Sequence, residues 1–135
     1  MNRFFIFDTN TLLSALFDEM SIPAEALKRA RINGVLLTSE VIILEYRTVF
    51  SGPKFDKYIS LPTRIEFIEN IIAQSFPVII TQEIKECRDS DDDKWLSLAV
   101  SAKSDCIISG DKDLLVLNPF REIPILTPAE FLNRF

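Results

Sequence analysis

The feature that most limits the fold of this chain is the alternation of short apolar runs with segments of helical composition. Runs of strand length and composition lie at residues 3–7, 35–38, 76–80, 106–109 and 123–126. Between them lie helix-favouring segments such as 24–31, 40–50 and 94–103. Strands that alternate with helices are typical of a parallel sheet covered by helices on both faces. The pattern therefore predicts an α/β fold, and the absence of a linker or repeat predicts a single domain over residues 1–135.

The composition excludes several kinds of site. The chain has 3 Gly and no glycine-rich phosphate loop, and with no His it has no Ser-His or Cys-His pair. A zinc site built from Cys87, Cys106 and carboxylates is not expected, so carboxylates should do any catalysis. The net charge of −5 argues against a general nucleic-acid binder, unless clustered acids hold metal ions. No run could span a membrane and no leader is recognisable, so we expect a cytoplasmic protein.

Two acids follow apolar runs directly. Asp8 ends the run at 3–7, and Asp111 comes two residues after the run at 106–109. In an open parallel sheet, ligands bind outside the carboxyl ends of the strands, so both carboxylates are placed for chemistry. Each also has an ordinary structural explanation, because Asp8 can cap the next helix and Asp111 can belong to a turn.

Two further acidic positions lie on predicted helices. One residue of the run Asp91–Asp93 is expected to cap the helix that follows. Asp92 shares a helical face with Trp95 and Leu96, which must pack on the sheet, whereas Asp93 points away from that face and is expected to be solvated. Glu45 lies in a helix that is apolar almost all round, and it either faces solvent or turns into a polar pocket.

Together these acids predict a metal site. Oxygen-only ligands suit Mg²⁺ or Mn²⁺ rather than zinc or copper. Converging carboxylates without His are the requirement of phosphodiester hydrolysis by two metal ions. Thr9, Asn10 and Ser109 could orient water or the ligands.

The order of these residues resembles the PIN-domain nuclease family, in particular its VapC-like branch of toxin–antitoxin toxins. The similarity is carried by the four stretches Phe7–Asn10, Leu44–Tyr46, Arg88–Leu96 and Ser104–Leu115. The ending at residues 125–132 is also similar. The resemblance implies a three-layer α/β/α sandwich and a Mg²⁺- or Mn²⁺-dependent endoribonuclease. It also implies a cognate antitoxin, an RNA substrate and a homodimer.

The resemblance also implies roles for individual residues. The acidic ligands would be Asp8, Glu45, Asp92 and Asp111. Asp93 is an alternative third acid, because a shift of one residue would match it instead. Asn10 and Ser109 would be polar helpers, and Asp113 is a further candidate helper. Candidate contacts for RNA phosphates, which are equally well explained as solvated surface charges, are Arg3, Arg47, Lys54, Lys57 and Lys112.

Three other functions were weighed. A haloacid-dehalogenase phosphatase needs a second Asp two residues after Asp8, where this chain has Asn10. A phosphorylated receiver domain would need paired acids at the end of the first strand. A non-catalytic PIN-like module that binds RNA or protein is the main alternative; it would be expected to have lost an acid, and none is lost here.

Overall fold

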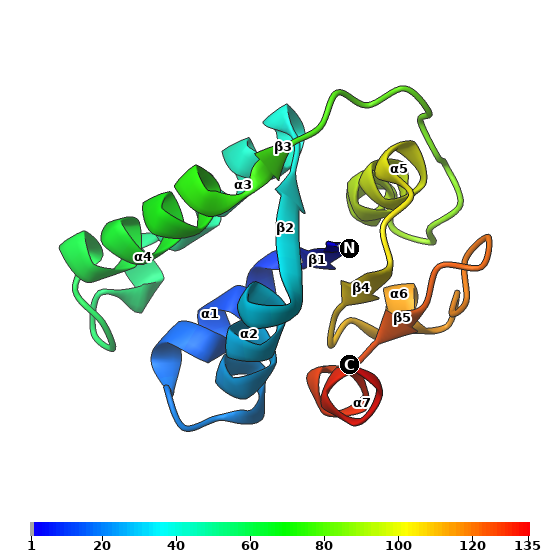
Figure 1. The fold of residues 1–135 in the computed structure, drawn as a ribbon. Helices are drawn as coiled ribbons and strands as arrows, with labels where there is room; N and C mark the ends of the chain where they lie inside the picture. The colour runs from blue at the N-terminus through cyan, green and yellow to red at the C-terminus, as the bar shows by residue number, and fades with distance from the viewer. Residues whose placement is uncertain (1) are drawn as a thin grey trace.

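Five parallel strands form one sheet in the order β3-β2-β1-β4-β5 in the computed structural model, which describes residues 2–135 (Figure 1). The strands are β1 (Arg3–Phe7), β2 (Gly34–Thr38), β3 (Phe76–Pro77), β4 (Cys106–Ile108) and β5 (Ile125–Leu126). Each neighbouring pair is parallel, and β1 lies at the centre, paired with β2 and β4. The predicted parallel sheet is confirmed.

Helices cover the sheet on both sides, as the three-layer prediction requires. They are α1 (Thr9–Phe17), α2 (Ile22–Asn33), α3 (Glu40–Phe50), α4 (Leu61–Gln74), α5 (Asp93–Ala102), α6 (Lys112–Leu115) and α7 (Pro128–Arg134), with short 3-10 turns η1 (Pro53–Phe55) and η2 (Ser90–Asp92). In Figure 1, α3 and α4 lie to the left of β2 and β3, α5 lies above β4, and α1, α2 and α7 lie in the lower part of the view. No helix within residues 2–135 is long and apolar enough to cross a membrane.

The central strand shows why both faces must be covered. Phe5, Ile6 and Phe7 are essentially fully buried, although neighbouring side chains of a strand point to opposite faces. On one face, Phe5 packs edge-to-face against Phe131 of α7, with ring centroids 5.1 Å apart. A strand that is apolar on both faces is the pattern of a parallel sheet between two helical layers.

Gly34 joins α2 to β2, and its role is to leave space. Its φ is −171°, which is extended backbone that any residue can adopt, so its conformation does not require Gly. A Cβ at this position would lie 2.3 Å from the carbonyl oxygen of Arg3 on the neighbouring strand. The position needs Gly because β1 and β2 approach closely there.

One predicted element differs from the structure. The strand expected at 76–80 is paired only at Phe76–Pro77, and the amide of Val78 makes one more bond to the carbonyl of Thr38. Two helices begin with clear local signals. Ser60 is the N-cap of α4, with Pro62 in the first turn, and Thr127 and Glu130 form a capping box at the start of α7.

The chain between β3 and η2 has no regular structure, yet its course is held by one face of α5. Ser101 accepts hydrogen bonds from the amides of residues 81 and 82, and Ser97 accepts one from the amide of Ile84. Asp93 accepts from the amides of residues 86 and 87. Positions 93, 97 and 101 are four residues apart and therefore line one side of the helix. This polar stripe satisfies amides that would otherwise pair within a sheet.

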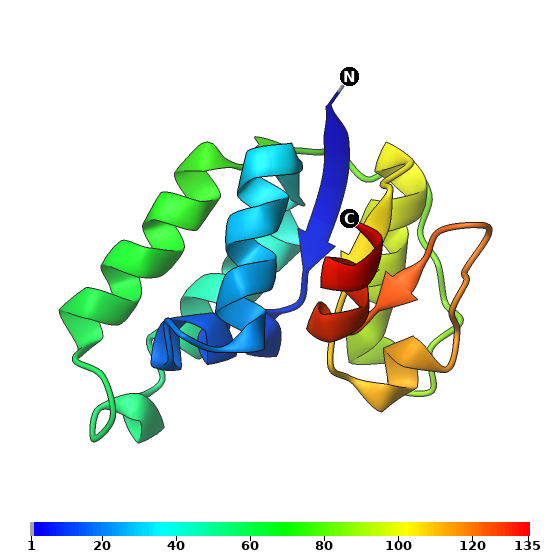
Figure 2. The same ribbon diagram turned by 60° about the horizontal axis from the view of Figure 1, so that its bottom comes forward.

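The carboxyl ends of the strands share one edge of the sheet. Figure 2 shows β1 ending at this edge, where α1 begins, with the start of α5 and the short α6 on the other side. The residues predicted to do chemistry follow β1 and β4 at this edge.

Candidate metal centre

Asp8 lies directly after β1, and each of its carboxylate oxygens accepts a hydrogen bond. Oδ1 accepts from the backbone N–H of Thr11 at 2.9 Å, which makes Asp8 the N-cap of α1. Oδ2 accepts from the hydroxyl of Ser109, at the end of β4. Burial raises the pKa of Asp8, and these hydrogen bonds oppose the rise. The capping role and the placement for chemistry, which the sequence left as alternatives, are therefore compatible.

Three other acids come together beside Asp8. Asp92, Asp111 and Asp113 each offer a carboxylate oxygen, and these oxygens all lie within 4.8 Å of one another. Asp111 is the N-cap of α6 and accepts a bond from the amide of Asp113, which draws the two side chains together. The hydroxyl of Ser109 accepts from the amide of Asp111 and so links this group to Asp8.

The electrostatics of this acidic group are unfavourable without a cation. Burial and then the charge of Asp111 raise the pKa of Asp92 to about 7. Part of this rise comes from the local negative charge of the neighbouring carboxylates. A bound divalent ion would balance it.

Glu45 projects from α3 into the same region, and cationic and hydroxyl donors hold it. The hydroxyl of Thr9 donates to Oε2, and the ammonium of Lys94 donates to Oε1. Beside it, the hydroxyl of Tyr46 donates to the carbonyl of Phe7 at 2.6 Å and fixes α3 to the end of β1. Of the two possibilities for Glu45, the structure shows a polar pocket rather than solvent.

These residues line one cleft with a volume of about 870 Å³. The cleft is formed by the start of α1, the middle of α3, η2 with the start of α5, and α6. Its lining residues include Asp8, Thr9, Asn10, Thr11, Ser14, Pro23, Glu45, Val49, Asp89, Asp91, Asp92, Trp95, Asp111, Lys112, Asp113 and Pro128. Four segments distant in sequence thus contribute acids to a single hollow.

Asp93 lies elsewhere, and the expectation that it is solvated is wrong. It holds the irregular chain at 86–87 through two backbone amides and borders a different hollow. The expected capping of α5 by the acidic run is also absent, since its N-cap Asp92 makes no side-chain cap bond. The capping acid is Asp89, which accepts from the amide of Asp91 and caps η2 instead.

Sequence reasoning underrated two residues of the site. Asp113 was only a possible helper, although its position two residues after an N-cap Asp at a helix start places both carboxylates side by side. Lys94 was not singled out at all, because its partner Glu45 is 49 residues away and only the fold brings them together.

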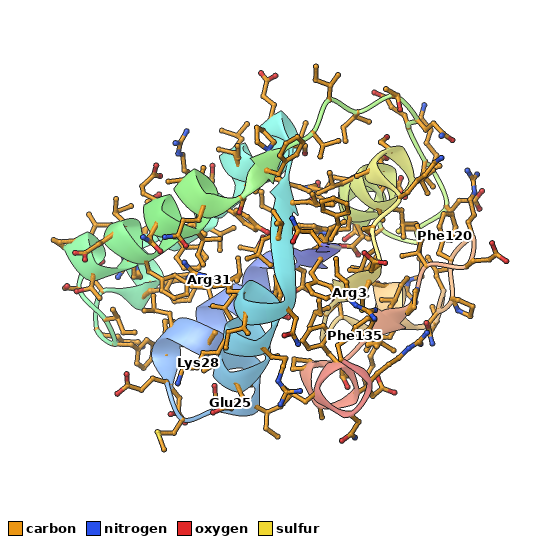
Figure 3. All side chains as sticks on the ribbon, viewed as in Figure 1. Arg3, Glu25, Lys28, Arg31, Phe120 and Phe135 are labelled. Carbon is orange, nitrogen blue, oxygen red and sulfur yellow. The ribbon has the colours of Figure 1, made fainter. Side chains whose placement is uncertain are left out.

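The candidate phosphate contacts are distributed over the surface. Lys112 lines the cleft. Arg47 is paired with Glu69, with both N–O distances at 2.8 Å. Arg3 starts β1, at the edge opposite the cleft, and its guanidinium lies 5.0 Å from the ring centre of Phe135, beside which Figure 3 shows it. Arg3 is therefore not a cleft residue.

Sequence comparisons show a family and a relative. A family model described as a PIN domain matches residues 5–113. The uncharacterized protein MJ1680 of Methanocaldococcus jannaschii is 33% identical over 141 residues, covering 96% of this chain and 90% of the relative.

Two solved structures share the fold at low sequence identity. PAE2754 from Pyrobaculum aerophilum has a TM-score of 0.63 at 10% identity, covering 97% of this chain and 88% of that one. VapBC2 from Rickettsia felis, bound to a DNA fragment from its promoter, has a TM-score of 0.59 at 14% identity, covering 91% of this chain and 96% of the other.

Proposed function

Because this chain belongs to the PIN-domain family, we propose that it is a divalent-metal-dependent endoribonuclease. The observation that carries the proposal is the convergence of Asp92, Asp111 and Asp113 within 4.8 Å, in the cleft that Asp8 and Glu45 also line. Three carboxylates close together concentrate negative charge and offer oxygen ligands. Both features suit a hard cation such as Mg²⁺ or Mn²⁺.

We assign the metal-holding role to Asp8, Glu45, Asp92 and Asp111, and add Asp113. The bound metal would activate water and stabilise the charge that develops on the phosphate. Ser109 and Thr11 fix the orientation of Asp8, while Thr9 and Lys94 fix that of Glu45. Side chains held by such secondary contacts keep the ligands in position when substrate binds.

The test is cleavage of a mixed RNA pool with Mg²⁺, with Mn²⁺ and with EDTA, by the wild type and by Asp111→Asn. Asn can replace Asp as the N-cap of α6, so this variant should keep its fold. Loss of a residue that only orients a metal ligand costs about 10- to 100-fold in activity, and loss of a ligand itself should cost at least about 100-fold.

The matched control is Asp91→Asn, which removes the same charge at the rim of the same cleft. Its side chain is 87% exposed and lies outside the three-acid group. We expect it to retain activity close to that of the wild type. If the wild type cuts nothing with either metal, or if Asp91→Asn is as impaired as Asp111→Asn, the catalytic assignment is wrong and the non-catalytic binding module becomes the better hypothesis.

We also propose that the protein is the toxin of a toxin–antitoxin pair and forms a homodimer. The fold similarity to VapBC2 supports this proposal. Val41 and Leu44 of α3 are 55% and 67% exposed and could bury apolar surface against a partner. Light scattering tests for the dimer, and co-expression with the product of a neighbouring small open reading frame tests for the antitoxin.

A further inference from the structure

The loop at 51–60, between α3 and α4, is built around a buried guanidinium. Arg64 of α4 is fully buried, and it donates to the carbonyls of Phe50, Gly52 and Ile59 and to the carboxylate of Asp56. A loop whose carbonyls converge on one buried cation has a fixed course. The side chains that it presents are therefore held in place.

Those side chains are aromatic and basic. Tyr58 is 66% exposed, and Phe17 at the end of α1 is 41% exposed. Phe17 contacts both Phe55 and Tyr58, with ring centroids 5.6 and 6.2 Å away. We call the group Phe17, Phe55, Tyr58, Lys54 and Lys57 the aromatic platform.

The two lysines of the platform are free to meet an anion. Lys54 lies 5.2 Å from the ring centre of Phe55, and Lys57 lies 5.1 Å from that of Tyr58. Among residues 2–135, no carboxylate lies within 4.0 Å of either ammonium group. The nearby Asp56 is paired with Arg64, so its charge is compensated.

The platform adjoins two helices that contribute to the wall of the acidic cleft. Ser14 and Val49 line that cleft. Phe17 is three residues after Ser14 and so lies on the same face of α1. The amide of Gly52 in the loop bonds to the carbonyl of Val49. Figure 2 shows the loop and η1 extending along the same side of the molecule as the carboxyl ends of the strands.

We propose that the aromatic platform binds single-stranded RNA beside the cleft, an inference that rests on the proposed function and names a substrate subsite for it. Exposed aromatic rings stack on unpaired bases, and lysines contact the adjacent phosphates. Asp18 and Glu19 follow Phe17, so the phosphates should pass on the opposite side, over Lys54 and Lys57. The eight residue steps of α1 from Thr9 to Phe17 span about 12 Å. A short single-stranded RNA could therefore reach from the platform to the acids.

The test measures binding without cleavage. A short fluorescein-labelled single-stranded RNA of mixed sequence is titrated with protein in EDTA, and anisotropy is followed at several salt concentrations. The variants are Tyr58→Ala and the double change Lys54→Gln with Lys57→Gln. The control double change is Arg3→Gln with Arg134→Gln, which removes the same charge from two cations that lie over Phe135 instead.

The expected results differ between the variants. Loss of one stacking ring weakens binding about 5- to 150-fold, and Tyr58→Phe should retain most of the affinity. Loss of two phosphate contacts reduces the slope of log Kd against log salt by about 1.4. The control should leave both quantities unchanged, and urea unfolding should show every variant folded.

Three outcomes would overturn the proposal: wild type that does not bind the RNA, Tyr58→Ala that binds within twofold of wild type, or a control that loses as much slope as the lysine variant. The nuclease proposal is judged separately by metal-dependent cleavage. Cutting that is lost in Asp111→Asn, together with normal binding by the platform variants, would remove the platform and leave the nuclease. Binding through the platform without cleavage under either metal would reject the nuclease proposal and leave the RNA-binding platform.

Discussion

Replacement of Arg64 by Met should destabilise the protein strongly, although the residue has only one acidic partner. Its guanidinium is fully buried and donates to three backbone carbonyls. One of these carbonyls belongs to Phe50, the last residue of α3. A cation at the C-terminal end of a helix is favourable, and the carbonyls would lose their donor.

The magnitude follows from these contacts. A buried acceptor left without a partner costs about 1–3 kcal/mol, and two of the three carbonyl bonds are only partly buried. The pair with Asp56 adds little, because that side chain is 60% exposed. Removing the guanidinium also removes the cost of its burial. We therefore expect a loss of about 3 kcal/mol in the free energy of unfolding.

Urea unfolding measures this loss. With an m-value of about 2 kcal/mol/M, the midpoint should fall by about 1.5 M. The matched control is Arg47→Met. Arg47 makes two bonds of 2.8 Å to Glu69, but the two side chains are 53% and 41% exposed, so its loss should cost at most about 1 kcal/mol.

The comparison can refute the reasoning. If Arg64→Met unfolds within 1 kcal/mol of the wild type, the bonds to the carbonyls only offset the cost of burying the charge. If Arg47→Met lowers the free energy of unfolding as much as Arg64→Met does, solvent exposure does not determine how much these cations stabilise the fold.

Two further predictions concern the acidic group and the sheet. At pH 8 in EDTA, Asp92→Asn should melt at a higher temperature than the wild type, because the pKa of Asp92 is raised from 3.8 to about 7 and its ionised form disfavours the fold. The difference should shrink steadily as the pH falls from 7 towards 3.8, and a difference of undiminished size near pH 4 would contradict this account. Gly34→Ala should lower the free energy of unfolding, measured in urea, by about 1–3 kcal/mol, because its Cβ would meet the Arg3 carbonyl. Gly110→Ala should be close to neutral, because a Cβ there has nothing within 4 Å. Equal losses in the two variants would show that lack of space is not the reason for Gly34.

The parts of the fold that follow local rules could be predicted from the sequence. The run at 3–7 is apolar at every position from 4 to 7, and it forms the buried central strand. The capping box at Thr127 and Glu130 lies within four residues, and both of its hydrogen bonds are present. Ser60 and Pro62 are a local signal of the same kind for the start of α4.

What depends on distant partners could not be predicted. Pro77 has no N–H, and after Val78 the chain leaves β2 for α5, so the apolar run at 76–80 does not form a full strand. Asp93 is engaged by amides six and seven residues before it. The sequence offers no sign that this partly buried acid at a helix start binds a loop rather than capping the helix.

The same limit applies to the acidic site. Strand ends predicted that Asp8 and Asp111 lie at one edge, and both line the cleft. Their metal-binding role stays a prediction. The contact between Lys94 and Glu45 joins α5 to α3, and no spacing in the sequence encodes it.

The polar stripe of Asp93, Ser97 and Ser101 holds the backbone path of residues 81–87 largely independently of their side chains. The stripe holds this stretch through backbone groups, which nearly every residue type provides. The exposed residues of the stretch can therefore be exchanged for others, Pro excepted, while the path stays the same; Ile84 is the exception, because it is buried in the core. Since Glu83, Lys85 and Cys87 border a second hollow of about 550 Å³, the helix acts as a fixed template beneath a surface whose exposed side chains are free to vary.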